Sequence, residues 1–194
     1  MSGASVAAAK PLIWAFGDSL TAGYGLSPAD GFTSQLERAL RKAGVPATIR
    51  NGGISGDTVA QARARLLWGL RGLGAKPDLV LVELGANDML RGLPPAQAEH
   101  NLDLILATLA QRHIKVLIAG MKASPNLGAD YRQAFDAIYP RLAERYHARL
   151  YPFFLDGVAG RRQLIQADGL HPNPMGVAII VDRMQALVQR ALRR

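Results

Sequence analysis

The sequence predicts an α/β fold, a three-layer α/β/α sandwich in which helices cover both faces of a parallel sheet. Short apolar runs alternate five times with longer stretches of helical periodicity, which is the pattern of a parallel sheet with crossover helices. The runs are apolar throughout, as strands buried on both faces are. The 194 residues, of which 49% are hydrophobic and 20% charged, suit one globular domain with a substantial core.

The strands are predicted where continuous apolar runs end at glycine or at turn residues. The third run, Leu-Val-Leu-Val-Glu-Leu, ends at Gly85 and is the clearest example. The predicted strands are residues 12–16, 47–50, 79–84, 114–119 and 150–155.

The helices are predicted from apolar residues that recur every three or four positions. Phe32, Leu36 and Leu40 share one face of the first helix, which Gly44 and Pro46 end. Pro95 stands in the first turn of another helix, where its missing N–H costs nothing. The predicted helices are residues 31–42, 58–73, 95–111, 130–146 and 174–192.

Composition excludes several classes of protein. There is no cysteine, so disulfide scaffolds, iron–sulfur sites and cysteine nucleophiles are excluded. No run approaches 18 apolar residues, so no transmembrane helix is predicted. His100, His113 and His147 show no metal-ligand spacing. We therefore expect neither a metal nor a cofactor.

The net charge is +8, from 23 basic and 15 acidic residues. The basic residues are scattered without a block of five or six; Arg63, Arg65 and Arg71, for example, lie on one predicted helix. We interpret most of the basic residues as solvated helix faces. No nucleic-acid partner is expected. The charge favours anionic surfaces or anionic acyl donors, so peripheral contact with lipid stays open, as does the oligomeric state.

Residues 1–10 are predicted to be a flexible N-terminal segment that precedes the domain at 11–194. The segment lacks the charged start and the leucine-rich run of an intact signal peptide. It fits either a remnant left after removal of a leader, which implies a periplasmic or secreted protein, or a cytoplasmic start.

Polar residues follow the predicted strands at the edge where ligands bind in open parallel sheets. Ser19 comes directly after the first strand, where serine also serves as a helix N-cap. The phosphate-binding glycine motifs are absent, and Thr21 replaces the second glycine of the G-x-S-x-G elbow.

A second polar group stands near the other end of the chain. Asp168 and His171 are three residues apart in a loop rich in glycine and proline. At this spacing the carboxylate can hold one ring nitrogen of the imidazole, leaving the other free to take a proton from a hydroxyl. A turn-capping aspartate beside a surface histidine is the alternative.

Donors for an oxyanion are available in the same loops. The backbone N–H of Ser19, the N–H groups of the glycine-rich loop that includes Gly56, and the side-chain amide of Asn87 all follow predicted strands. Each has an ordinary alternative as a turn or cap residue, but their meeting at one sheet edge favours a serine esterase.

Together these residues resemble the GDSL, or SGNH, hydrolase superfamily. The resemblance rests on four blocks in order: Gly17-Asp18-Ser19-Leu20, Gly56, Gly85-x-Asn87-Asp88 and Asp168-x-x-His171. The strings at 54–58 and 82–88 look like the bacterial branch of multifunctional acyl-CoA thioesterases, arylesterases and lysophospholipases. One departure is Ala86, which replaces a glycine that is frequent at this position.

The resemblance implies a flavodoxin-like sandwich of about five parallel strands and a role for each residue. Ser19 would be the nucleophile and His171 the general base and acid, oriented by Asp168. Ser19, Gly56 and Asn87 would donate to the oxyanion. The expected substrate is a small acyl ester or thioester.

Five further residues are candidates for supporting or substrate-binding roles. Glu83, a carboxyl group inside an apolar strand, is expected to support the third loop. Asp18 and Asp88 are expected to brace the first and third loops. The segment 121–128, with Met121 and Pro125, is expected to line an acyl pocket. A non-catalytic α/β module that binds acidic or lipid surfaces is the alternative function.

Overall fold

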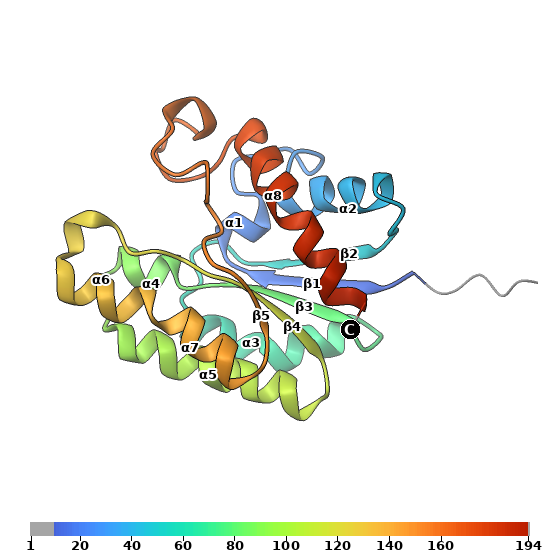
Figure 1. Cartoon of the computed structure of the whole chain (residues 1–194), viewed down its shortest axis with the longest axis horizontal. Helices are drawn as coiled ribbons and strands as arrows, with labels where there is room; N and C mark the ends of the chain where they lie inside the picture. The colour runs from blue at the N-terminus through green and yellow to red at the C-terminus, as the bar shows by residue number, and fades with distance from the viewer. Residues whose placement is uncertain (1–9, 194) are drawn as a thin grey trace, which may run out of the picture.

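The computed structural model describes residues 10–193 and shows a five-stranded sheet between two layers of helices (Figure 1). Its neighbouring strands run parallel in the order β2-β1-β3-β4-β5, which confirms the predicted fold class. The strands are β1 (Leu12–Gly17), β2 (Thr48–Gly53), β3 (Leu79–Glu83), β4 (Lys115–Ala119) and β5 (Arg149–Tyr151). The predicted N-terminal segment lies outside the described residues except for Lys10, so its boundary stays a prediction.

Helices cover both faces of the sheet (Figure 1). One layer holds α1 (Ser19–Ala22), α2 (Phe32–Lys42) and α8 (Pro174–Arg193). The other holds α3 (Val59–Gly72), α4 (Ala86–Leu90), α5 (Pro95–Gln111), α6 (Ala129–Asp136) and α7 (Ile138–Arg145). Two short 3-10 turns, η1 (Pro125–Leu127) and η2 (Arg162–Leu164), lie in the loops after β4 and β5.

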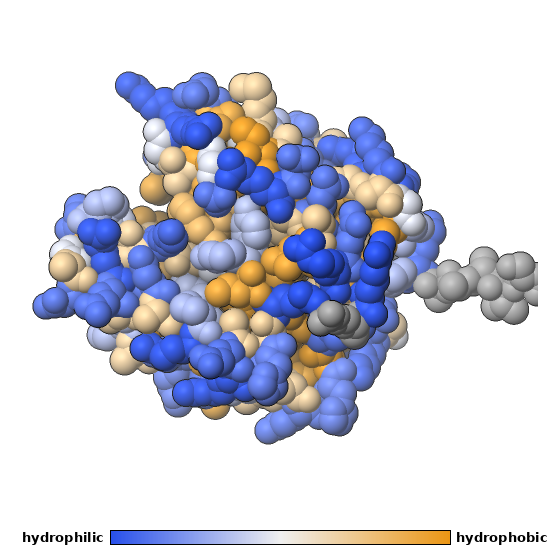
Figure 2. All heavy atoms as spheres, in the orientation of Figure 1, coloured by the Kyte–Doolittle hydropathy of each residue, from blue (hydrophilic) through white to orange (hydrophobic). Residues whose placement is uncertain are grey.

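The strands form the centre of the hydrophobic core, because apolar side chains project from both faces of the sheet. Every residue of β3 is buried, and so is every residue of β1 after Leu12. Figure 2 shows hydrophilic residues over most of one face of the molecule, with hydrophobic residues gathered between α7 and α8 near the edge strand β5. No helix within residues 10–193 is long and apolar enough to cross a membrane.

Two predicted elements end earlier than their patterns indicate. The strand predicted over 150–155 is wrong beyond Tyr151, because Pro152 has no N–H for a ladder and the chain turns so that the Phe154 N–H bonds to the Gly120 carbonyl (2.8 Å). The helix predicted over 130–146 is two helices that meet at Ala137. Pro140 cannot donate to the carbonyl four residues before it.

The register places the ends of the strands level with one another. Gly17 at the end of β1 lies opposite Gly53 on one side and Glu83 on the other, and Glu83 lies opposite Ala119. The chain turns from β1 to β2 on one side and reaches β3 on the other, so the carboxyl ends of β1 and β3 flank the switch point where such sheets bind ligands.

Candidate active site

The turn after β1 holds Ser19 at the start of α1. Asp18 is the residue that caps this helix, with its Oδ1 accepting the N–H of Leu20 (3.0 Å), so the alternative of Ser19 as the helix cap does not hold. Gly17 is required here, since a Cβ would stand 2.1 Å from Thr21 Oγ1 and 2.6 Å from the Glu83 carbonyl oxygen. Ser19, which follows, lines a cavity at this edge of the sheet.

The structure brings Ser19, His171 and Asp168 into one hydrogen-bonded chain. His171 Nε2 lies 2.8 Å from Ser19 Oγ, and His171 Nδ1 lies 2.7 Å from Asp168 Oδ2. Asp168 Oδ1 accepts the N–H groups of Leu170 (2.9 Å) and His171 (3.0 Å), and these bonds lower the pKa of Asp168 to about 2. The carboxylate is thus ionised at neutral pH, which places the imidazole proton on Nδ1 and leaves Nε2 to accept the serine proton.

The loop that carries the pair is held by Gln166, which the sequence analysis missed. Its backbone N–H donates to the His171 carbonyl (2.7 Å), and its Nε2 donates to the carbonyls of Tyr24 (2.8 Å) and Pro172 (3.0 Å). The Tyr24 ring lies 4.7 Å from the imidazole, centre to centre. Nothing in the local pattern distinguishes Gln166 from an ordinary loop residue, because its link to Tyr24 joins segments far apart in the sequence.

The three predicted oxyanion donors border one cavity. Asn87, on α4, donates from Nδ2 to the Asp57 carbonyl (3.0 Å) and to Asp18 Oδ2 (3.1 Å). Gly56 has a φ of +86°, a conformation that favours glycine. Gly56, Asn87 and Ser19 line the same cavity. The structure therefore brings these residues together, as the sequence predicted.

Two carboxyl groups are buried beneath the Ser19 turn. Glu83 accepts a hydrogen bond from the Thr21 hydroxyl at Oε2 (2.7 Å), so it supports the first loop, and the prediction that it supports the third loop is wrong. Burial, followed by the charge of Asp18, raises the pKa of Glu83 well above its ordinary value. Burial also raises the pKa of Asp18 to about 6. Both shifts have the same main cause, because burial disfavours two adjacent charged carboxyl groups.

Asp88 joins the third loop to the helix after the second loop. Its Oδ2 accepts the N–H of Val59, the first residue of α3, at 2.9 Å. The side chain is buried, and burial raises its pKa. The bracing role predicted for Asp88 therefore connects α4 to the N-terminus of α3 rather than acting within its own loop.

The cavity beside Ser19 and His171 has a volume of about 690 Å³. Its walls are mainly apolar and come from the segments that follow all five strands. Apolar lining residues include Met89, Leu90, Met121, Pro125, Phe153 and Leu155. The structure thus places Met121 and Pro125 in the wall, as predicted.

Comparison with known proteins identifies the family. The model of the GDSL-like Lipase/Acylhydrolase family matches residues 15–179. An arylesterase of Vibrio mimicus is 41% identical over 174 residues, which cover 90% of this chain and 85% of that protein. The thioesterase 1/protease 1/lysophospholipase L1 of Escherichia coli K12 is 38% identical over 183 residues, covering 94% of this chain and 86% of that protein.

Comparison with solved structures supports the same family. The SGNH-hydrolase family esterase AlinE4 is 49% identical and superposes with a TM-score of 0.82 over 96% of this chain and 98% of that one. TesA is 36% identical, with a TM-score of 0.86 over 93% of this chain and 99% of that one. The predicted resemblance and enzyme class are confirmed: the chain belongs to the GDSL-like lipase/acylhydrolase family and is a serine hydrolase of carboxylic esters and/or acyl thioesters.

Proposed function

We propose that Ser19 is the nucleophile of this hydrolase, with His171 as general base and acid and Asp168 as its orienting carboxylate. The observation that carries the proposal is the 2.8 Å contact between Ser19 Oγ and His171 Nε2, with Nδ1 held by Asp168. An imidazole fixed in this tautomer can remove the serine proton as Oγ attacks the acyl carbonyl. It then returns the proton to the leaving alcohol or thiol, and water repeats the cycle on the acyl-enzyme.

The oxyanion of the tetrahedral intermediate is bound by the N–H groups of Ser19 and Gly56 and by Asn87 Nδ2. The Ser19 N–H lies at the start of α1, and Asn87 has two amide N–H groups. In the structure one of them donates to the Asp57 carbonyl and the other to Asp18 Oδ2, so donation to the oxyanion requires the second N–H to be shared between Asp18 and the oxyanion. Donors held in place before the reaction stabilise the developing charge without reorganisation.

Replacing Ser19 by alanine tests the nucleophile. We expect turnover of p-nitrophenyl butyrate to fall by about 10⁴-fold or more, because the covalent step is lost. A fluorophosphonate should label the wild-type protein once and leave Ser19→Ala unlabelled by intact-mass analysis. Ser124→Ala is the matched control, since Ser124 lines the same cavity. Retained turnover in Ser19→Ala would refute the assignment.

The cavity supports an apolar acyl chain as the group that is transferred. Its volume of about 690 Å³ and its apolar walls fit a medium-length chain. Names of relatives include both arylesterase and thioesterase, which fits a site that holds the acyl group and leaves the leaving group near solvent. A panel of acyl lengths on p-nitrophenol and on coenzyme A tests this, and a sharp preference for acetyl esters would contradict it.

The rim of the cavity supports peripheral contact with a lipid surface. Tyr24 and Leu90 are each 54% exposed and Leu170 is 49% exposed, although all three line the cavity. Lys122 is an exposed cation on the same wall. Exposed apolar side chains around a substrate entrance, beside positive charge, suit an anionic lipid surface.

Sedimentation with vesicles tests this contact. Using the Ser19→Ala protein, we expect more binding to vesicles that contain phosphatidylglycerol than to pure phosphatidylcholine. Leu170→Ser should weaken that binding. Equal and negligible binding to both vesicles would refute the contact without affecting hydrolysis of soluble esters.

A further inference from the structure

Arg65, on α3, is a partly buried cation behind the candidate active site. Its side chain is only 16% exposed, whereas Arg63 and Arg71 on the same helix are exposed. Arg65 is therefore an exception to the interpretation of most basic residues as solvated helix faces. Burial of an arginine is costly unless its N–H groups are paired, so the contacts of Arg65 need an explanation.

The guanidinium of Arg65 donates three hydrogen bonds, each to a different segment of the chain. Nε donates to Asp57 Oδ2 (2.6 Å), Nη1 to the Gly52 carbonyl (2.9 Å) and Nη2 to the Gly17 carbonyl (2.9 Å). Its central carbon lies 4.5 Å from the centre of the Phe16 ring. A planar fork suits this set of acceptors, and the single ammonium of lysine does not.

Each acceptor belongs to a segment that carries a proposed oxyanion donor. Gly17 is two residues before Ser19. Gly52 lies near the end of β2 and so fixes the start of the loop that carries Gly56. Asp57 holds Asn87 through its backbone carbonyl (3.0 Å). One side chain thus joins the three segments whose mutual distances define the oxyanion site.

We propose that Arg65 is a positioning residue that sets the geometry of the oxyanion site by clamping the ends of β1 and β2 and the Asp57 turn. The proposal rests on the oxyanion role given above to Ser19, Gly56 and Asn87. Arg65 does not line the substrate cavity, so it acts through these segments. Its charge is paired with Asp57, which makes its contribution one of placement rather than direct attraction of the oxyanion.

Steady-state kinetics of Arg65→Ala and Arg65→Lys test the first part of the proposal. A displacement of the donors by about 1 Å should lower kcat by about 10- to 100-fold, with KM changed less than threefold because the acyl cavity is untouched. Arg65→Lys should not restore kcat. Arg141→Ala is the matched control, since Arg141 also makes a two-pronged contact, with Glu99 on the surface, and it should keep wild-type kcat.

A double-mutant cycle with Asn87→Ala tests whether Arg65 acts through the oxyanion site. Because Arg65 holds Asn87 through Asp57, its removal should cost only a few-fold in kcat once Asn87 is already gone. The pH–rate profile of Arg65→Lys should keep the wild-type midpoint, because Arg65 does not contact His171. A general loosening of the fold would instead move KM and the profile together, and would overturn the proposal.

Two further results decide the outcome if Arg65→Ala unfolds easily. Guanidinium at millimolar concentration should restore part of kcat to Arg65→Ala and none to Asn87→Ala. The proposal would be overturned if Arg65→Ala lowered kcat by the same factor in the Asn87→Ala background as in the wild type. It would also be overturned if Arg65→Lys had the kcat of the wild type. Neither result affects the role of Ser19, which its own labelling experiment tests.

Discussion

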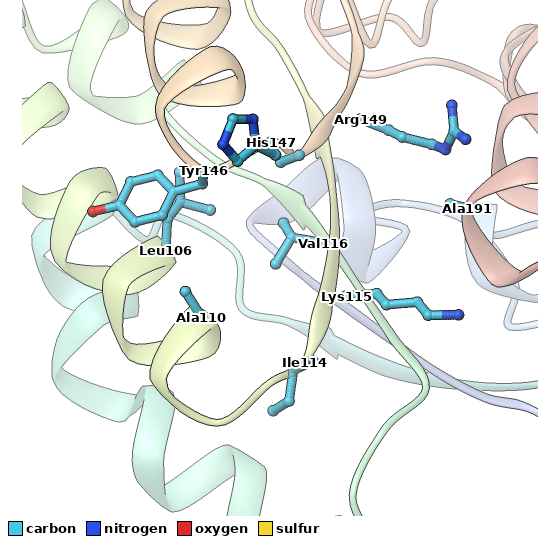
Figure 3. A pocket seen from close by; sticks show the side chains of 10 residues that line it. Leu106, Ala110, Ile114, Lys115, Val116, Tyr146, His147, Arg149 and Ala191 are labelled. Atoms are coloured by element: carbon cyan, nitrogen blue, oxygen red, sulfur yellow. The ribbon is translucent and has the colours of Figure 1, made fainter. Parts of the chain in front are cut away.

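Two cavities at opposite ends of the sheet show why one of them is the candidate active site. The first, of about 690 Å³, lies where the strands end, and the second, of about 520 Å³, lies where β4 and β5 begin. Ser19, Asn87 and His171 converge on the first. The second is lined by apolar side chains with Lys115, His147 and Arg149, and Figure 3 shows Lys115 and Arg149 extending away from Tyr146 across the strands.

The two cavities have different physical origins. The second exists because β5 begins to pair with β4 only at Leu117, which leaves Lys115 and Val116 without a neighbouring strand on that side. The first is formed by loops that follow several strands and carry hydrogen-bonded polar groups. A hollow of similar size thus acquires chemistry only where the chain returns repeatedly to the same edge.

Among substitutions that distinguish the two cavities, the largest loss of kcat is expected at Asn87, in the first cavity. Asn87→Ala should lower kcat for p-nitrophenyl butyrate by about 10²–10³-fold with little change in KM, because an oxyanion donor acts mainly in the transition state. Asn101→Ala, which removes a buried asparagine whose side chain donates to the Gln97 carbonyl within α5, is the control. An unchanged kcat in Asn87→Ala would remove this residue from the oxyanion site.

The next effect concerns acyl length. Met121 is buried in the cavity wall, so Met121→Ala should lower kcat/KM for dodecanoyl esters by about tenfold relative to acetyl esters, because apolar contacts with the distal chain are lost. Asn126→Ala, in the same loop but outside the wall, should leave the ratio unchanged. Equal losses for both chain lengths would show that the segment is a plain connector.

Asp168 and Asp18 should contribute to the free energy of unfolding with opposite dependence on pH. The pKa of Asp168 is lowered to about 2 in the folded protein, so its stabilisation is present above the unfolded value of about 4 and disappears as the pH falls towards 2. The pKa of Asp18 is raised to about 6. Its burial therefore lowers stability progressively as the pH rises from about 4 to 6.

Urea unfolding from pH 2 to 7 checks these opposite slopes. The free energy of unfolding of Asp168→Asn should approach that of the wild type as the pH falls from about 4 to 2. The loss of stability between about pH 4 and 6 should be smaller in Asp18→Asn than in the wild type. Parallel curves for all three proteins would contradict both pKa assignments.

Most of the chemistry of the candidate site could be predicted because it is encoded in short local blocks. Ser19 follows a strand directly, and Asp168 and His171 share one turn, so a parallel sheet is enough to bring them to one edge. Arg65 could not be predicted in this way, because its partners depend on how α3 packs over β1 and β2. The sequence places Arg65 on a predicted helix and gives no sign of these contacts.

The errors at Glu83 and after Tyr151 have the same origin. The contact between Glu83 and Thr21 crosses from β3 to α1, and the register that creates it is a property of the sheet rather than of either segment. The apolar residues after Pro152 resemble a continued strand, and Phe154 is fully buried, but its burial comes from a turn that folds back over Gly120. Burial was thus predicted correctly where the backbone conformation was not.

The smallest change in kcat and stability is expected for a substitution in the second cavity. Arg149→Ala should leave kcat and KM within twofold of wild type, and the free energy of unfolding within about 0.5 kcal/mol, as is usual for substitutions away from buried networks. The measurement is the same butyrate assay with urea unfolding. A loss of kcat comparable to that of Asn87→Ala would mean that the two ends of the sheet are energetically coupled, and that the second cavity acts on the reaction through β4 and β5.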